Sequence, residues 1–132
     1  GCAMMVKKEV IDKVGMMAEK YFVYYDESDW SARIIKAGYK IYYQANGLCF
    51  HKESISMGKQ SPIKVHYMTR NRILYMRRNA TMPQFLVFIG FFSFLTVPKT
   101  IIKFVINKQF EHLKAFIKGI SWNLTQSKYS PV

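Results

Sequence analysis

The sequence has 132 residues, the size of one domain, and its 50% hydrophobic and 16% aromatic content excludes a disordered tail. Lys and Arg outnumber Asp and Glu by 20 to 8, so the net charge of +12 requires an anionic partner: nucleic acid, a phosphorylated ligand or an acidic membrane surface. The charge is uneven, because residues 1–51 carry seven basic against six acidic side chains, whereas residues 52–132 carry thirteen against two.

The two cysteines and the N-terminus carry little chemistry of their own. Cys2 and Cys49 form no disulfide framework and no metal-ligand spacing, so we expect two small thiols in a reducing compartment. The chain begins with Gly1 and has no signal-peptide pattern. We therefore expect it to be a piece cut from a longer protein.

The first part of the chain predicts short strands alternating with two short helices. A helix over residues 7–14 should end at Gly15, and a second over residues 29–37 should begin after Ser28 as N-cap and end at Gly38. Trp30, Ile34 and Ala37 would then face the core. Aromatic and β-branched runs predict strands at residues 3–6, 40–44 and 48–51, and either a strand or an extended loop at residues 21–25.

The second part predicts helices. Residues 52–60 are polar and predict a loop, after which Ser61 and Pro62 begin a helix that runs to about Asn79. Residues 85–97 form an uncharged run that is shorter than the roughly 20 residues of a membrane span, which favours a buried or interfacial helix.

Residues 99–120, if continuous, form an amphipathic helix. A stripe of basic side chains lies opposite an Ile and Phe face; its members are Lys99, Lys103, Lys114 and Lys118. Such a helix fits the headgroup region of an anionic membrane, and the alternative is a surface helix packed on its own domain.

An acidic cluster is the most informative stretch. Asp26, Glu27 and Asp29 lie between Tyr25 and Trp30. Mutual repulsion and burial beside aromatic rings raise the pKa of carboxylates, which suits a general base or a cation site. The structural alternatives are acids that complement a helix dipole, and an i,i+4 ion pair between Asp29 and Arg33.

Residues 1–79 resemble the second half of the catalytic domain of family 2 glycosyltransferases of the GT-A fold, most closely the bacterial rhamnosyltransferase-like branch. The block Tyr21–Trp30, with its aromatic-acid-acid-x-Asp pattern, and the following Arg33 and Ala37-Gly38-Tyr39 are specific in combination. Further matching segments are Gly1–Val10, Val14–Met16, His51–Gly58 and Tyr67–Arg72.

This resemblance implies an α/β fold: residues 1–80 would be the acceptor-side half of a GT-A (Rossmann-like) catalytic domain. Residues 81–132 would form an apolar and amphipathic basic helical tail near the membrane. The implied reaction is an inverting hexosyl transfer, in bacterial polysaccharide biosynthesis, from a nucleotide-sugar donor to a polysaccharide or lipid-linked saccharide acceptor.

The resemblance also assigns roles to individual residues. The family usually writes the catalytic acid pair as Glu-Asp, whereas this chain has Asp-Glu, so the base position falls on Glu27 and Asp26 is the second candidate. Acceptor-binding or orienting roles fall on Asp29, Trp30 and Arg33. Candidates for the donor phosphates are His51, Lys59, Arg70 and Arg72, of which His51 is also a metal-ligand candidate. The structural alternatives are a histidine that ends a strand and, for the other three, solvated cations on a helix.

The nucleotide-binding βαβ unit and the DxD motif of such enzymes do not occur in this sequence. The divalent metal, Mg²⁺ or Mn²⁺, is therefore expected in the full-length enzyme, held mainly by that missing half, and the fragment is expected to be inactive alone. We expect the protein to lie in the cytoplasm, peripherally associated with the inner membrane. The sequence leaves open whether it forms a homo-oligomer.

Two other function classes compete. A nucleic-acid-binding module would fit the net charge, but the cations are spread over a helix and an apolar tail rather than one aromatic-rich basic face. A small integral membrane protein would use residues 85–106 as its span, against which stand Pro98, Lys99 and Lys103.

Overall fold

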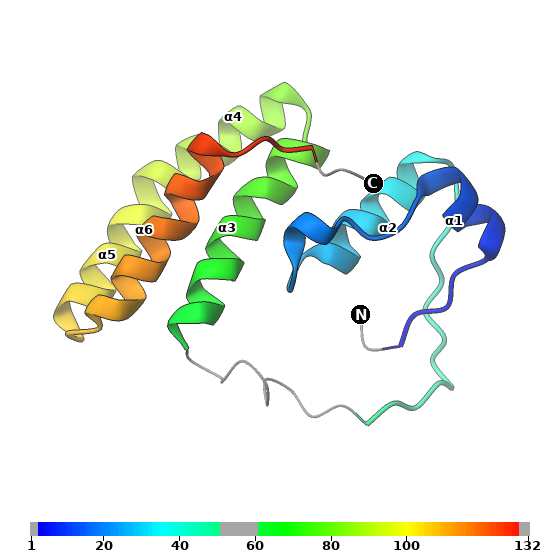
Figure 1. The fold of residues 1–132 in the computed structure, drawn as a ribbon, viewed down its shortest axis with the longest axis horizontal. Helices are drawn as coiled ribbons and strands as arrows, with labels where there is room; N and C mark the ends of the chain where they lie inside the picture. The colour runs from blue at the N-terminus through cyan, green and yellow to red at the C-terminus, as the bar shows by residue number, and fades with distance from the viewer. Residues whose placement is uncertain (1–2, 51–60, 130–132) are drawn as a thin grey trace.

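The computed structural model describes residues 3–50 and 61–129, and these ranges fold as helices joined by loops (Figure 1). A short pair of helices at one end adjoins a bundle of longer helices at the other. The elements in chain order are α1 (Lys8–Val14), the 3₁₀ turn η1 (Glu19–Tyr21), α2 (Asp26–Lys36), α3 (Pro62–Asn79), α4 (Met82–Phe91), the π-helical turn η2 (Phe92–Thr96), α5 (Val97–Ile106) and α6 (Phe110–Thr125).

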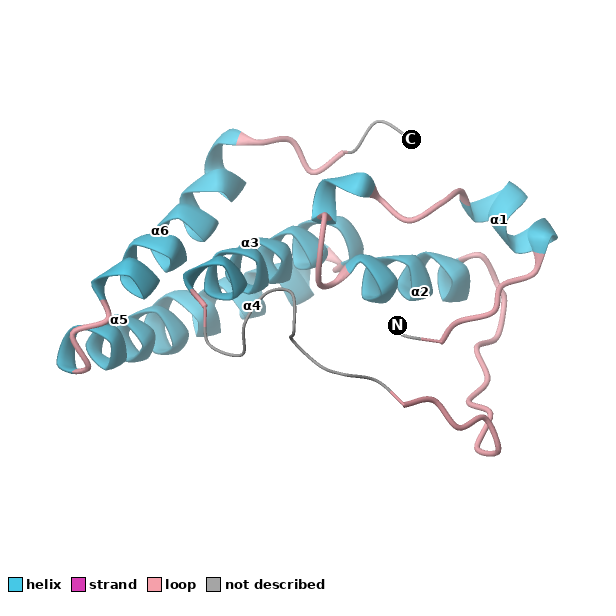
Figure 2. Cartoon of the chain, turned by 60° about the horizontal axis from the view of Figure 1, so that its bottom comes forward, coloured by secondary structure: helices cyan, strands magenta, loops and turns pink. Residues whose placement is uncertain are grey.

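The α/β, Rossmann-like prediction is wrong for the described residues, none of which lies in a β-strand (Figure 2). A strand needs a neighbouring strand to pair its backbone N–H and C=O groups, whereas a helix pairs them internally. The aromatic run at residues 40–44 finds no such neighbour, and Tyr43 is 90% exposed. Residues 3–6 are likewise extended without a ladder, although Met4 and Val6 pack against the core of α1 and α2.

Helix boundaries follow the local signals with one exception. Gly15 ends α1 with φ 78°, a conformation that favours glycine, and the Ser61 side chain accepts a hydrogen bond from the Lys64 N–H at the start of α3. The predicted start of α2 after Ser28 is wrong. The helix begins three residues earlier, so Asp26, Glu27 and Asp29 all lie in its first turn.

Two separate apolar clusters form the core. The first lies between α1 and α2 and is centred on Val10, Trp30 and Ile34. The second lies within the α3–α6 bundle and is centred on Ile73, Phe92, Phe104 and Phe116. The connection between them is polar and is described with the candidate site below.

The predicted continuous helix over residues 99–120 is wrong. The chain turns at residues 107–109, where Lys108 has φ 54°, and α6 returns beside α5 (Figure 1). The turn allows Phe116 of α6 to pack on Phe104 of α5, with ring centroids 6.4 Å apart. Folding back therefore buries an aromatic pair that one straight helix would leave apart.

The π turn η2 sets the packing of the long apolar helix formed by α4, η2 and α5. Phe88 lies four residues before Phe92, the first residue of the turn. Val97 follows five residues after Phe92, and Ile101 and Phe104 continue the same packed face. The i→i+5 pattern of a π turn accommodates this extra residue, so both halves of the helix direct their packing residues to one cluster. Pro98, which has no N–H, lies directly after the turn.

A close helix–helix contact holds α6 against α3. A Cβ atom built on Gly119 would lie 2.8 Å from the carbonyl oxygen of His66 and 3.1 Å from the backbone nitrogen of Arg70. One turn later, the Asn123 side-chain nitrogen donates to the Arg70 carbonyl at 2.9 Å. The two backbones approach closely because residue 119 has no side chain.

We predict that Gly119→Ala destabilises the fold by about 1–3 kcal/mol, because its methyl group would overlap backbone atoms of α3 that cannot rotate away. Gly90→Ala is the matched control: no atom lies within 4 Å of the added Cβ, so helix propensity should leave it neutral or more stable by up to about 1 kcal/mol. Denaturant unfolding of both variants measures the difference, and equal stabilities would contradict the close contact.

Candidate functional site

The loop that leads into α2 has a strained backbone. Phe22, Tyr24 and Tyr25 have φ values of 63°, 63° and 69°, in the left-handed region that bulky residues rarely adopt. Each such residue costs roughly 1–3 kcal/mol and persists only where the surrounding structure holds it. These φ values also exclude the strand predicted for residues 21–25.

Asn71 of α3 holds this loop. Its side chain is fully buried, and its Nδ2 atom lies 3.0, 2.6 and 2.9 Å from the carbonyl oxygens of Tyr21, Val23 and Tyr24. These contacts satisfy backbone groups that a strand partner would otherwise satisfy. One amide on α3 thereby fixes the path of the chain up to the first residue of α2.

Arg70 of α3 holds the same loop as Asn71. Its Nη2 group donates to the carbonyl oxygens of Lys20 and Tyr21 at 2.7 Å, and its Nε group donates to Asn71 Oδ1 at 2.8 Å. The guanidinium lies 4.6 Å from the Tyr67 ring centroid and 4.7 Å from that of Trp122. Burial lowers the pKa of Arg70, and these contacts engage its guanidinium within the fold.

Asp29 joins the two cores. Its fully buried carboxylate accepts hydrogen bonds at 2.7–3.0 Å from four side chains. These donors come from three separate parts of the chain and are Tyr21, Arg33, Arg78 and Asn79. Burial opposes the negative charge, but the hydrogen bonds from Asn79 and the two arginines, together with the attraction of Arg78, hold the pKa of Asp29 below its usual value.

Trp30 and Arg33 tie α2 to the end of α1. Trp30 is buried in the first core, and its indole N–H donates to the Gly15 carbonyl at 2.8 Å. Arg33, besides its ion pair with Asp29, donates to the carbonyl oxygens of Val14 and Met16 at 2.7 Å. In the described residues both side chains contact protein groups that position α2.

Glu27 and Asp26 form a neighbouring acid pair in the first turn of α2. The hydrogen bond between their side chains, then burial and the negative charge of Asp26, raise the pKa of Glu27. A carboxylate with a raised pKa is a better proton acceptor near neutral pH than an ordinary glutamate. Unlike Asp29, both side chains are only partly buried, so a ligand can reach them.

Aromatic and basic side chains of α3 contact Tyr24 and Tyr25, the two residues that directly precede this acid pair. The Arg72 Nε group donates to Tyr25 Oη at 3.4 Å, and the Tyr25 and Tyr75 rings lie 5.8 Å apart. The Lys64 ammonium lies 5.9 Å from the Tyr24 ring centroid. Cations and aromatic rings of α3 therefore contact the residues adjoining the acid pair, and these are the kinds of group that bind phosphates and sugar rings.

The structure leaves two of the predicted site residues without a described position. His51 and Lys59 lie outside the described residues. Within residues 3–50 and 61–129, no group of three or more His, Cys, Asp or Glu side chains could hold a metal ion. The expected Mg²⁺ or Mn²⁺ therefore has no site in the described part of the chain, and no step below uses it.

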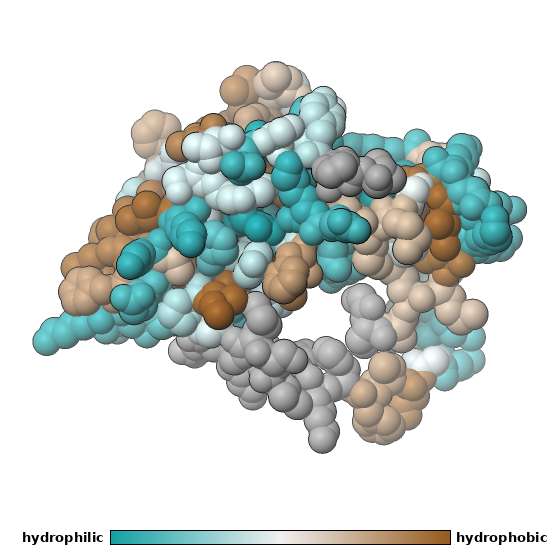
Figure 3. All heavy atoms as spheres, in the orientation of Figure 1, coloured by the Kyte–Doolittle hydropathy of each residue, from teal (hydrophilic) through white to brown (hydrophobic). Residues whose placement is uncertain are grey.

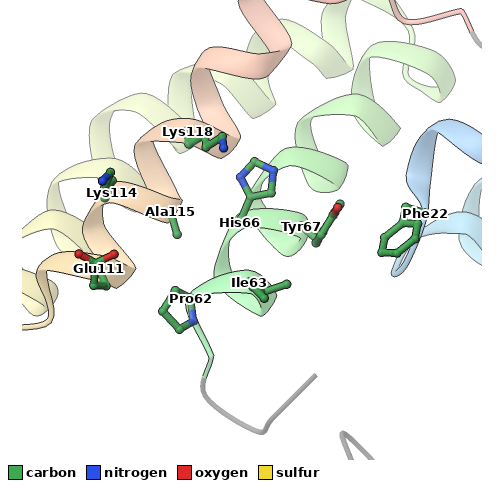
Figure 4. Close-up of a pocket in the computed structure, with 9 residues that line it drawn as sticks. All are labelled: Phe22, Pro62, Ile63, His66, Tyr67, Glu111, Lys114, Ala115 and Lys118. Carbon is green, nitrogen blue, oxygen red and sulfur yellow. The ribbon is translucent and has the colours of Figure 1, made fainter. Parts of the chain in front are cut away.

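A pocket of about 520 Å³ opens between α3 and α6 (Figure 4). Its lining includes Phe22 from the strained loop, His66 and Tyr67 from α3, and Lys114 and Lys118 from α6. Burial is the main reason that the pKa of His66 lies below its usual value, and its buried Nδ1 atom makes no hydrogen bond within the described residues. Of the sequence-predicted site residues that the structure describes, none lines this pocket.

Sequence reasoning missed the residues that hold the site, namely Tyr21, Asn71, Arg78 and Asn79. Asn71 and Arg78 are seven residues apart and so lie on one face of α3, opposite the apolar residues that face α6. In the sequence, this row of polar residues along a helix that also carries buried apolar residues was the signal that could have identified Asn71 and Arg78. It was not recognised because the apolar residues of α3 alone form no clean face.

We predict that Asp29→Asn destabilises the fold by about 3–5 kcal/mol at pH 7, because Arg33 and Arg78 would keep their charges without the buried carboxylate. Because the folded-state pKa is lowered, the stabilisation is present above the unfolded pKa of about 3.9 and is lost as pH falls through the lower folded value. Unfolding free energies of wild type and variant should therefore converge below about pH 4.

The control for this prediction is Asp12→Asn, which removes an exposed i,i+4 ion pair with Lys8 and should change stability by less than about 1 kcal/mol. A loss for Asp29→Asn that is equally small, or that stays constant between pH 3 and pH 7, would contradict the buried-charge account.

Comparisons with known proteins give one partial match. The chain is 30% identical over 83 residues to a dTDP-rhamnosyl transferase of Shigella flexneri, an alignment that covers 57% of this chain and 28% of that enzyme. The chain thus spans less than a third of its relative. No family model and no solved structure matches it. The partial similarity relates the chain to glycosyltransferases, in agreement with the resemblance found in the sequence.

Proposed function

We propose that the chain is the acceptor and base part of an inverting family 2 glycosyltransferase. The observation that carries this proposal is the Asp26–Glu27 pair at the start of α2, where the pKa of Glu27 is raised. The similarity to a rhamnosyl transferase supports the reaction class. The donor is a nucleotide sugar, and the acceptor is a saccharide, free or lipid-linked, whose hydroxyl group is deprotonated as it attacks the anomeric carbon.

In this mechanism Glu27 accepts the proton of the acceptor hydroxyl. The new bond forms on the face of the sugar opposite the departing nucleoside diphosphate, so the configuration inverts. Tyr25 and Tyr75 offer aromatic faces for a sugar ring, and Arg72 supplies positive charge for the donor phosphates. Asn71 and Asp29 have a positioning role in this mechanism. Asn71 holds the loop before α2, and Asp29 holds α2, the helix that carries Glu27.

The division of labour along the chain is part of the proposal. Residues 1–80 belong to the catalytic part, and residues 81–132 form the tail that brings it to the cytoplasmic face of a membrane. Because the chain spans 28% of the related transferase, we assign nucleotide binding and the divalent metal to the remainder of the enzyme. The fragment would then be inactive alone.

Glu27→Gln in the full-length enzyme should lower the turnover number by about 10²–10⁴-fold, because general-base catalysis contributes that factor. Binding of the donor nucleotide, measured by calorimetry, should be retained. Glu19→Gln makes the same chemical change at an exposed position in η1 and should leave turnover unchanged. Turnover of Glu27→Gln within about tenfold of wild type would exclude Glu27 as the base.

The pH dependence of kcat/KM should separate Glu27 from Asp26. A base must be deprotonated, so activity falls as pH drops through the raised pKa of Glu27, above the roughly 4.3 of an ordinary glutamate. Asp26→Asn removes the acidic neighbour that raises this pKa, so the acidic limb should move to lower pH while activity at neutral pH persists. Loss of activity at all pH values would instead identify Asp26 as the base.

A further inference from the structure

The helix formed by α4, η2 and α5 is apolar on more than its packed side. Met82–Ile106 is 25 residues long; its most apolar stretch of 18 residues has a mean hydropathy of 2.0, and only 6% of that stretch is buried. By length and composition it is sufficient to cross a membrane. Its outward side chains are therefore a large apolar surface that the described part of the chain leaves uncovered.

One face of this helix is packed and the other is open. Phe92 and Phe104 are buried against α3 and α6, whereas Val87 and Phe94 are 74% and 82% exposed. The remaining exposed apolar side chains of the helix are Met82, Leu86, Phe91, Leu95, Ile102, Val105 and Ile106. In Figure 3 apolar side chains gather along the edge where α4 and α5 run in Figure 1.

The open apolar surface continues onto α6. Phe110, Ile117 and Leu124 are exposed, and their spacing of seven residues places them on one face of that helix. Because α6 lies beside α5, two antiparallel helices present apolar rows side by side. Exposed apolar surfaces of this extent mark sites of membrane or protein interaction.

Lysine side chains border this surface. Lys99 and Lys103 are exposed and each lies three residues before an exposed isoleucine, Ile102 and Ile106 respectively. On α6, exposed Lys114 lies four residues after Phe110. Cations at the rim of an apolar face can contact lipid phosphates while the apolar side chains enter the acyl region.

The packing of α3 argues against a membrane-crossing orientation. Val65 and Ile73 of α3 belong to the same cluster as Phe92 and Phe104, so α3 runs alongside the apolar helix. If the apolar helix crossed the membrane, α3 and its charged side chains would enter the hydrocarbon core. The transfer of charged side chains from water to hydrocarbon has a large free-energy cost. These side chains include Lys64, Arg70, Arg72, Arg77 and Arg78.

We propose that the α4–η2–α5 helix and the Phe110, Ile117 and Leu124 row of α6 lie in the plane of one leaflet of an anionic bilayer, without crossing it. The lysines at the rim contact lipid phosphates, and α3 with the acid pair stays in the aqueous phase. This docking mode rests on the membrane location in the proposed function and adds its surface and orientation to it.

The first test measures binding of the full-length protein to vesicles of phosphatidylcholine with and without 30% phosphatidylglycerol. Val87→Asp and Phe94→Asp should each lower the partition coefficient at least about tenfold on anionic vesicles, because each puts a charge on the inserted face. Ile35→Asp, an exposed apolar position on α2, should leave binding unchanged. Far-ultraviolet circular dichroism of each variant confirms that the helices are retained.

A second pair of variants addresses the lysines. Lys99→Gln with Lys103→Gln should lower affinity for the anionic vesicles by roughly 25-fold, about fivefold per lysine, and leave affinity for neutral vesicles unchanged. Lys7→Gln with Lys8→Gln removes two exposed cations near α1 and should have no such effect. Equal effects of the two pairs would assign the attraction to net charge alone and overturn the oriented docking.

Orientation is tested by cysteine labelling after Cys2 and Cys49 are replaced by serine. Gln84→Cys and Asn107→Cys mark the two ends of the long helix at exposed polar positions, in protein synthesised in the presence of closed vesicles. Both ends should react with a membrane-impermeant maleimide added outside. Reaction of one end only would show a crossing helix and overturn the proposal.

Two further outcomes would also overturn it. Absence of vesicle binding would do so, as would a dimer seen by sedimentation that buries the same face without lipid. Either failure leaves the proposed reaction standing, because Glu27→Gln is assayed with a water-soluble acceptor.

Discussion

The buried carboxylate of Asp29 is the interaction on which the architecture depends. The two apolar clusters have no residue in common, and hydrogen bonds to this buried charge join the helices that carry them. Asp29 accepts them from α2 itself, from the 3₁₀ turn and from the end of α3. A buried charge is tolerated only where such partners satisfy it, which makes the relative position of the two units strongly specified.

The candidate site is built on that junction. Asn71 and Arg70 hold a loop whose φ values are unfavourable on their own, and the loop delivers Asp26 and Glu27 to a face of α3 that carries cations and tyrosines. Rigid residues thus lie behind the reactive pair, while the pair itself is reachable. This separation of supporting and reacting groups is typical of sites that require accurate placement of a proton acceptor.

Local signals in the sequence predicted where helices occur, but not the start of α2 or the turn at residues 107–109, and no predicted strand forms in the described residues. Gly15, Ser61 and Pro62 act on their immediate neighbours, so their effect was readable from a few residues. The strands at residues 21–25 and 40–44 depended on partners elsewhere in the chain, and such partners are absent from the described residues. The acid pair was identified from its neighbours, whereas Asn71 was not, because its contacts are about 50 residues away in sequence.

The distance of about 50 residues in sequence between Asn71 and the loop that it holds affects the order in which the protein folds during synthesis. When Tyr21–Tyr25 leaves the ribosome, Asn71 has not yet been synthesised, and at roughly 5–20 residues per second the wait lasts several seconds. During this interval no amide is present to hold the left-handed backbone, so the loop samples other conformations. The acid pair at the start of α2 therefore reaches its final position only after α3 has emerged.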